Sequence, residues 1–178
     1  MNKVIETIFE RRSIRAFEPR AIEKERVAEI LECGRRAPNA WGHQSFELFA
    51  ITDPLLMDEL AALTAKYLGG EVEEHRFFSA PLIVLISDLR ENFMRLADAG
   101  CIMENMFIAA QSYGIGSVWI NQLSPISDKL EVMDKLESIG IAKNRVVTSI
   151  GAFGYPAGAP REKELVTKIH YINQEGSL

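Results

Sequence analysis

A basic stretch near the N-terminus holds the side chains of this sequence that are best suited to binding an anion. Arg11, Arg12 and Arg15 lie within five residues, and Ser13 stands between them. Guanidinium groups bind phosphate oxygens through paired N–H donors, and a serine hydroxyl adds one more donor. These residue types predict a phosphate site, although a solvated basic helix end would have the same composition.

The overall charge sets this stretch apart. The 178 residues carry a formal net charge of -5, with 47% hydrophobic and 25% charged residues. Nucleic-acid-binding domains are broadly basic, so we expect no nucleic-acid partner. A local group of cations in an acidic protein indicates a small anionic ligand instead.

The other reactive side chains form no recognisable catalytic or metal-binding set. Cys33 and Cys101 lack a CxxC spacing and the histidines are scattered, so we expect neither a zinc site nor a structural disulfide. Gly114 and Gly116 lack the third glycine of a dinucleotide fingerprint and precede a predicted strand instead of following one. An enzyme without acid–base or nucleophilic groups usually takes its chemistry from a cofactor.

No segment is suited to export or to a membrane. The N-terminus carries Lys3, Glu6 and Arg11, so it lacks the apolar core of a signal peptide. The longest apolar run, residues 80–86, is far shorter than the roughly 20 residues that span a bilayer. We expect a soluble protein of the reducing cytoplasm with no membrane partner.

Helical spacing of apolar residues predicts the elements that would position the basic stretch. A short helix ahead of Arg11 would bury one face through Val4, Ile5, Ile8 and Phe9. A second helix is expected from about Glu23 to before Pro38, and a third from a cap at Asp53 to Gly69-Gly70. A fourth is expected from about Asn92 to Tyr113. The last begins at Ser127 or Asp128 and ends at Gly140, and its inward residues would be Leu130, Met133 and Leu136.

Strands are predicted over residues 46–51, 82–87, 117–120 and 145–150. Residues 46–51 are apolar on both faces apart from Glu47, which indicates a central strand. The alternation of strands and helices, taken alone, predicts a doubly wound parallel sheet.

Two segments suggest a subunit interface. The helix over residues 92–113 is apolar around most of its circumference, so we expect it to be the central helix or to form part of such an interface. The tail from residue 157 to 178 has alternating apolar residues and no core of its own, which suggests that it contacts a partner. No linker divides the chain, so we expect one domain over residues 1–178.

Four segments, in order along the chain, resemble motifs of the FMN-dependent nitroreductase family. RRSIRAF at residues 11–17 is similar to the family's R-R-S-x-R-x-F phosphate motif, and RAPNAWGHQ at 36–44 is similar to its A-P-S-S-x-N-x-Q-P-W loop. GIGSVWI at 114–120 resembles the G-L-G-x-x-W-I segment, and GAFGYP at 151–156 resembles a characteristic turn that Arg161 and Lys163 follow.

The resemblance implies an α+β fold in which helices flank a central, mainly antiparallel sheet. It also implies an intertwined homodimer with FMN at the interface. The whole chain, 1–178, would form one FMN-binding domain, and its tail from about residue 157 to 178 would extend onto the partner subunit. The long apolar helix would contribute to the dimer interface.

The same resemblance implies a set of cofactor-binding residues. The FMN phosphate and ribityl chain would be held by Arg11, Arg12, Ser13, Arg161 and Lys163. The second motif contributes Arg36 and, approaching FMN from the partner chain, Pro38, Asn39, Ala40 and Gly42. The isoalloxazine ring would lie along Trp119, Ile120 and Asn121. Arg15 would lie near the flavin N1 and O2 edge, where a cation raises the reduction potential. No residue would be a nucleophile or a metal ligand.

The second motif departs from the family pattern. Asn39 and Ala40 replace two serines, Gly42 replaces an asparagine, and Ser45-Phe46 replace Pro-Trp. These departures leave the individual loop contacts with FMN open, but they do not affect the phosphate motif.

The implied activity is an FMN-dependent oxidoreductase that passes hydride from NADH or NADPH through flavin N5 to a nitroaromatic, a quinone or a similar acceptor by a ping-pong mechanism. Two alternatives remain open: a specialised flavin enzyme of the same fold, such as a dehalogenase or ring oxidase, and a non-catalytic FMN carrier or sensor. The sequence leaves open the physiological acceptor, the choice between NADH and NADPH, and the reactivity with oxygen.

Overall fold

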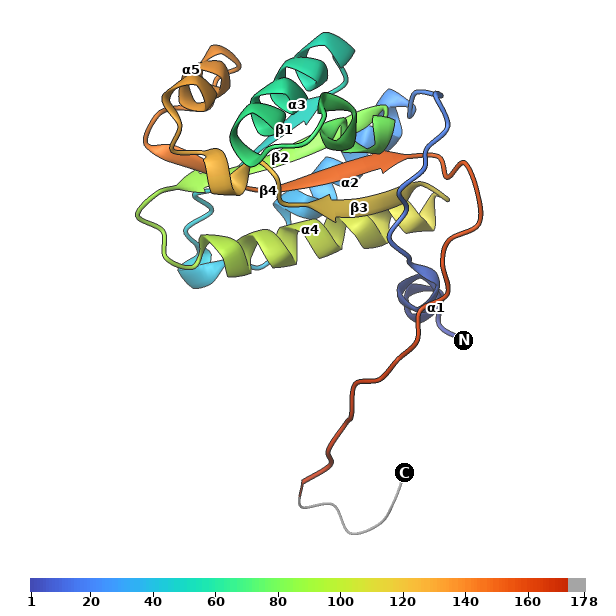
Figure 1. Cartoon of the computed structure of the whole chain (residues 1–178). Helices are drawn as coiled ribbons and strands as arrows, with labels where there is room; N and C mark the ends of the chain where they lie inside the picture. The colour runs from blue at the N-terminus through green and yellow to red at the C-terminus, as the bar shows by residue number, and fades with distance from the viewer. Residues whose placement is uncertain (173–178) are drawn as a thin grey trace.

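The computed structural model describes residues 1–172 and shows a four-stranded sheet flanked by helices (Figure 1). The helices and strands are α1 (Lys3–Glu10), α2 (Lys24–Arg35), β1 (Glu47–Ile51), α3 (Pro54–Leu68), β2 (Leu82–Leu89), α4 (Arg95–Ser112), β3 (Gly116–Ile120), α5 (Leu130–Ser138) and β4 (Arg145–Gly154). Short 3-10 turns lie at η1 (Ala40–Gly42), η2 (Val72–His75), η3 (Phe77–Ser79) and η4 (Ser124–Ile126).

The sheet has the order β1-β2-β4-β3, and each neighbouring pair is antiparallel. The α+β fold is therefore confirmed, and the parallel sheet expected from the strand–helix alternation is wrong. Ile51 at the end of β1 pairs with Ile83 at the start of β2. Because α3 and the segment after it leave and return to the same end of the sheet, the second strand runs back along the first.

Strand β1 is an edge strand, so the expectation that it is central is also wrong. Its apolar residues have another cause. Phe49 packs against the core on one face of the sheet and Leu48 packs against the core on the other. Because helices cover both faces of the sheet here, this edge strand is apolar on both faces, as a central strand would be.

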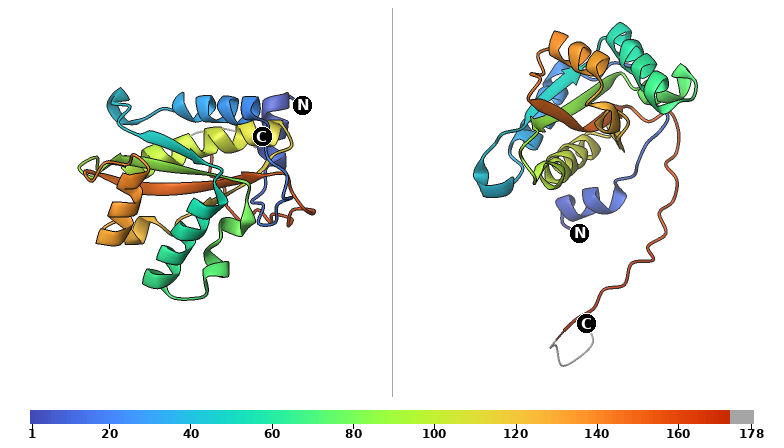
Figure 2. Two further views of the ribbon diagram at one scale, coloured as in Figure 1. Left: turned by 90° about the horizontal axis from the view of Figure 1, so that it is seen from above. Right: turned by 60° about the vertical axis from the view of Figure 1, so that its left-hand side comes forward.

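Two apolar cores lie on opposite faces of the sheet, each between the sheet and the helices that cover that face in the right-hand view of Figure 2. Successive residues of β2 alternate between them, with Ile83 and Leu85 facing α3 and α5, and Val84 and Ile86 facing α2 and α4. Strand β2 is buried from Leu82 to Asp88 because both faces are covered.

The helix signals read from the sequence are confirmed at α3 and only in part at α5. The Asp53 side chain accepts a hydrogen bond from the Leu55 N–H at 3.0 Å, and Gly69, with φ 85°, ends α3. Helix α5 begins at Leu130, which is 68% exposed, whereas Val132 and Leu136 face inward. The expected inward position of Leu130 is wrong because the first residue of this helix projects beyond the core.

The apolar face of α1 and the tail after β4 are exposed in the single chain. Val4 and Phe9 of α1 are 61% and 62% exposed, so the expected burial of this face does not occur within one chain. Residues 157–172 form neither helix nor strand and run away from the sheet (Figure 1). The last part of the predicted tail, residues 173–178, lies outside the described residues.

Helix α4 packs beside α2 on one face of the sheet, and its inner side is buried. Ile102, Met103 and Met106 are fully buried, whereas Leu96 is 58% exposed. One face of α4 is thus covered by the chain itself, and another remains open.

The basic stretch is fixed to the edge of the sheet. The Ile14 N–H donates to the Ser117 carbonyl at 3.0 Å, and the Ala157 N–H donates to the Ala16 carbonyl at 3.0 Å. A Cβ on Gly116 would lie 2.7 Å from Ile14 Cγ1, so only glycine lets the stretch approach β3 this closely. The fold therefore holds residues 13–17 between β3 and the chain after β4.

Candidate functional site

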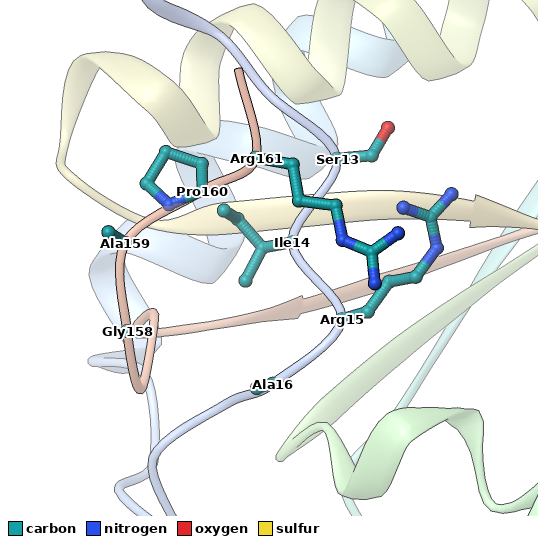
Figure 3. Close-up of a pocket in the computed structure, with 8 residues that line it drawn as sticks. All are labelled: Ser13, Ile14, Arg15, Ala16, Gly158, Ala159, Pro160 and Arg161. Carbon is teal, nitrogen blue, oxygen red and sulfur yellow. The ribbon is translucent and has the colours of Figure 1, made fainter. Parts of the chain in front are cut away.

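A hollow of about 470 Å³ opens between the basic stretch and the chain that follows β4 (Figure 3). Residues 13–16 line one side and residues 158–161 line the other. The Ile14 side chain is buried against Gly116, while Ser13 and Arg15 are exposed. Because neighbouring side chains of an extended segment point to opposite sides, Ser13 and Arg15 project to the side opposite Ile14, which the Arg161 guanidinium also reaches (Figure 3).

The hollow contains two cations for which residues 1–172 provide no hydrogen-bond or ion-pair partner. Arg15 and Arg161 extend their guanidinium groups to the same side of residues 13–16 in Figure 3. Within residues 1–172, neither guanidinium takes part in a recorded hydrogen bond or ion pair. Two unpaired guanidinium groups and the hydroxyl of Ser13 form a donor set suited to a phosphate or a similar anion.

Arg11 and Arg12, which were expected beside them, point elsewhere in this structure. Arg11 Nε lies 3.2 Å from Glu104 Oε1, and its guanidinium carbon lies 5.9 Å from the centre of the Phe107 ring. Arg12 donates to the carbonyls of Phe9 at 2.6 Å and Arg11 at 2.8 Å. It thereby satisfies carbonyl groups at the C-terminal end of α1, which have no partner inside the helix.

The second predicted segment lies apart from the hollow. Arg36 is paired with Glu32 at 2.8 Å, and Pro38 and Gly42 are exposed. The Ala40 N–H donates to Asp98 Oδ1 at 2.8 Å, which places the loop beside the N-terminal part of α4. The hollow and this loop lie at opposite sides of the molecule in Figure 1.

The remaining predicted residues are exposed to different degrees. Trp119 is 42% exposed and lies over α4, where its Cη2 would be 3.9 Å from a Cβ on Gly100. Ile120 is half-buried, Asn121 is exposed, and Lys163 is exposed in the tail without lining the hollow. The structure therefore brings together Ser13, Arg15 and Arg161, and it leaves the other predicted positions outside the hollow.

A polar cluster supports the chain that leads to the hollow. The Tyr155 hydroxyl donates to Glu23 Oε2 at 2.6 Å, and Arg20 donates to Glu23 Oε1 at 3.0 Å. The hydrogen bond from Tyr155, with further donation from the backbone and Arg20, lowers the pKa of Glu23 to about 2. The same bond raises the pKa of Tyr155. The cluster ties the start of α2 to the residue directly after β4.

No other set of chemically active groups competes with the hollow in the described part of the chain. Residues 1–172 contain no group of three or more His, Cys, Asp or Glu side chains placed to hold a metal ion. Cys33 lies on α2 and Cys101 on α4, and both are free. None of the helices described is both long and apolar enough to cross a membrane.

Sequence reasoning missed residues 158–160, which form one wall of the hollow, and Asp98, which holds Ala40. The Pro-Ala-Gly-Ala-Pro run at 156–160 was a signal for irregular chain beside Arg161. Asp98 was detectable as a carboxylate in the long apolar segment, but its partner is 58 residues away in the sequence.

Comparison with known protein sequences gives consistent matches. A profile described as "Nitroreductase family" matches residues 8–155. A protein of Archaeoglobus fulgidus named "Putative NADH dehydrogenase/NAD(P)H nitroreductase" is 28% identical over 159 residues, which cover 88% of this chain and 87% of that protein. The protein named "FMN reductase (NADPH)" of Bacillus subtilis is 29% identical over 188 residues, covering 94% of this chain and 72% of that protein.

Comparison with solved structures agrees with these matches. The crystal structure of a nitroreductase with bound FMN from Bacteroides fragilis superposes with a TM-score of 0.87 at 31% identity. The match covers 97% of this chain and 100% of that one. The similarity therefore extends over the sheet, the helices and both walls of the hollow.

Proposed function

The chain belongs to the nitroreductase family, and from this premise we propose that it is an FMN-dependent oxidoreductase. In this proposal it uses NADH or NADPH to reduce a nitroaromatic, a quinone or a similar small acceptor. The related proteins named for NAD(P)H-dependent reduction, and the Bacteroides fragilis structure with bound FMN, support the assignment. The observation that carries it in this chain is the hollow with two unpaired guanidinium groups.

The residues of the hollow fit the chemistry of FMN. A phosphate monoester carries about 1.5 to 2 negative charges at neutral pH, and Arg161 and Ser13 offer it a guanidinium and a hydroxyl. The volume of about 470 Å³ lies within the range of small-molecule sites. In an acidic protein, two cations that meet no carboxylate within the described residues support an anionic ligand at this place.

We assign different tasks to the two arginines of the hollow. Arg161 and Ser13 bind the phosphate and the ribityl chain, and Arg15 neutralises the N1 and O2 edge of the ring, where negative charge accumulates on reduction. The charged groups of Arg11, Arg12 and Lys163 do not face the hollow in this structure. In the proposal, these three side chains change conformation and then join the phosphate contacts.

When bound, FMN would supply the redox chemistry, hydride transfer from NADH or NADPH by way of flavin N5 to an acceptor in a ping-pong cycle. The protein contributes binding, orientation and charge. Trp119, Ile120 and Asn121 are proposed to lie along the ring system, and no side chain of this chain needs to act as a nucleophile.

We further propose that the site is completed by a second copy of the chain in a homodimer. Pro38, Asn39, Ala40 and Gly42 would then contact FMN bound in the hollow of the other copy, and Arg36 of the same motif is proposed as a further cofactor-binding residue. The separation of this loop from the hollow within one chain supports this arrangement. The exposed apolar residues of α1 and of the tail support it as well, because large apolar surfaces of this kind usually mark an interface. Residues 1–178 form one domain in this proposal.

Steady-state kinetics test the proposed activity. Oxidation of NADH and of NADPH is followed with menadione as acceptor, at several fixed concentrations of each substrate. We expect turnover and parallel lines in double-reciprocal plots, which indicate a ping-pong cycle. Turnover with intersecting lines would contradict the ping-pong cycle, and bound flavin without turnover would favour the carrier or sensor alternative.

A further inference from the structure

The loop that precedes β1 has an unfavourable backbone conformation. Trp41 has φ 53°, Gly42 has φ 69° and Gln44 has φ 50°. A residue with a bulky side chain rarely adopts the left-handed region, so contacts made by the loop must hold Trp41 in this shape. The Gln44 N–H donates to Asn39 Oδ1 at 2.9 Å within the loop. The Trp41 ring lies 5.4 Å from the ring of Phe93, but Trp41 and Phe93 are 68% and 74% exposed, so further support comes from buried groups outside the loop.

Two buried carboxylates anchor the loop near its ends. Asp98 of α4, which is 6% exposed, accepts the Ala40 N–H at Oδ1 over 2.8 Å. Asp88 of β2, which is 1% exposed, accepts the Ser45 hydroxyl at Oδ1 over 2.7 Å. The strained residues lie between these two anchor points.

One amide joins the two carboxylates. Asn92 Nδ2 donates to Asp88 Oδ2 at 2.8 Å and to Asp98 Oδ2 at 3.3 Å. Asn92 Oδ1 accepts the Met94 N–H at 3.0 Å, which fixes the amide at the start of α4. An asparagine amide has two N–H donors, and here each has a carboxylate to bind. The orientation of Asp98 toward Ala40 is therefore set by the end of β2 and the start of α4.

We propose that Asp98 is a positioning residue of the cofactor site. By accepting the hydrogen bond from Ala40, it holds the loop 39–45 in the conformation that contacts FMN. Asp88 and Asn92 keep the Asp98 carboxylate in place. This inference rests on the proposed function, in which this loop approaches the flavin of the second copy. Asp98 itself does not touch the cofactor.

The test compares FMN affinity across variants of the full-length protein, measured by fluorescence titration after removal of flavin. Asp98→Ala removes the acceptor for Ala40, and we expect about tenfold weaker binding, since a hydrogen bond to a buried charged group is lost. Asp98→Asn keeps an oxygen acceptor for Ala40 but turns an N–H donor toward the amide of Asn92, so we expect its affinity to lie between those of Asp98→Ala and the wild type. Thr64→Ala is the control, because it removes a fully buried side-chain hydrogen bond from α3 on the other face of the sheet.

Hydrogen exchange of the Ala40 amide in flavin-free protein provides a readout that a general loss of stability would not reproduce. We expect faster exchange in Asp98→Ala than in Thr64→Ala or Asp98→Asn. Should Asp98→Ala fail to fold, Ser45→Ala, which removes the other anchor, is expected to weaken FMN binding about threefold.

Failure of this inference and failure of the proposed function give different experimental results. If wild-type protein binds FMN and neither Asp98→Ala nor Ser45→Ala changes its affinity, the positioning role is wrong and the proposed function stands. Faster amide exchange without a change in affinity also overturns the inference. Wild-type protein that binds no FMN contradicts the proposed function, and the inference falls with it.

Discussion

Arg15 and Arg161 meet at the hollow although they lie near opposite ends of the chain. Arg15 is held there because Ile14 is buried against Gly116 and hydrogen-bonded to Ser117. Arg161 reaches the same place because the chain after β4 is bonded to Ala16 through Ala157. The two cations are therefore brought together by backbone contacts, not by contacts between their own side chains.

Replacing Arg161 tests the anion site at the level of one residue. We expect Arg161→Ala to weaken FMN binding about ten- to a hundredfold, because hydrogen bonds to charged groups contribute about 1.5 to 3 kcal/mol. The dissociation constant is measured by fluorescence titration. Arg76→Ala is the matched control, since Arg76 is an exposed arginine paired with Asp58 of α3 and does not line the hollow. Equal affinities for both variants would contradict the assignment of Arg161.

The identities of the hollow residues could be predicted from the sequence better than their orientations. The resemblance singled out Ser13, Arg15 and Arg161, and all three line the hollow. It also singled out Arg11, whose side chain instead meets Glu104 on α4. An arginine side chain is long enough to choose among several partners, and a partner 93 residues away cannot be read from local spacing.

At the level of elements, the close contact between the basic stretch and β3 controls the geometry of the hollow. A Cβ on Gly116 would lie 2.7 Å from Ile14 Cγ1 and 2.9 Å from Ile14 Cβ. We expect Gly116→Ala to lower the free energy of unfolding by about 1 to 3 kcal/mol, as overpacking does in other proteins. Urea denaturation measures the change.

Gly158→Ala serves as the control for this substitution. No atom lies within 4 Å of a Cβ at Gly158, so we expect an unchanged free energy of unfolding. A Gly116→Ala variant as stable as the Gly158→Ala variant would show that Ile14 moves away without cost, contrary to the packing described.

The contact between α2 and the end of β4 makes a pH-dependent contribution to stability. The pKa of Glu23 is lowered to about 2 from an ordinary value of 4.5, chiefly by the hydrogen bond from Tyr155. Because the folded-state pKa is lowered, this contribution is fully present above pH 4.5 and is lost as the pH falls toward 2. The side chain is 48% exposed, so solvent screening keeps the effect small.

Melting temperatures of the wild type and of Glu23→Gln, measured across this pH range, test the contribution. The wild type is expected to be more stable at neutral pH, with a difference that shrinks below pH 4.5 as Glu23 is protonated. Glutamine does not titrate, so a difference that is independent of pH would show that the Glu23 charge has no such role.

The direction of the strands could not be predicted from element order. Each connection between strands contains a helix, but the helix order does not reveal that the chain after α3 returns to the end of the sheet it left. Likewise, the apolar pattern of β1 showed that both faces are covered without showing that β1 is an edge strand. Antiparallel pairing joins residues far apart in sequence, such as Leu82 with Phe153. The local spacing of apolar residues does not indicate which strands pair.

At the level of the whole molecule, exposed apolar residues on α1 and the tail support the proposed homodimer. Phe9 of α1 is 62% exposed, and Leu165 and Ile169 of the tail are 78% and 75% exposed. The sequence showed Phe9 at helical spacing and alternating apolar residues in the tail. What covers them could not be predicted from spacing, because a periodic apolar face has the same pattern whether its partner is the same chain or another copy.

A charged substitution on α1 tests the proposed homodimer. We expect the wild type to have a mass of about twice 20.0 kDa by light scattering. Phe9→Glu is expected to shift the protein toward the monomer and to reduce FMN binding, because each site would lose the loop of the second copy. Leu130→Glu is the matched control, since Leu130 is 68% exposed on α5. Dimers of both variants would exclude α1 from the interface.

The absorbance spectrum of the purified protein, recorded before and after addition of NADH or NADPH without oxygen, tests the central claim most directly. The account predicts flavin absorbance bands that bleach with at least one of the two donors. Bands that persist with both would contradict the proposed reductase activity. A protein without flavin bands, even after incubation with FMN and removal of the excess, would contradict the assignment of the hollow formed by Ser13, Arg15 and Arg161 as the cofactor site.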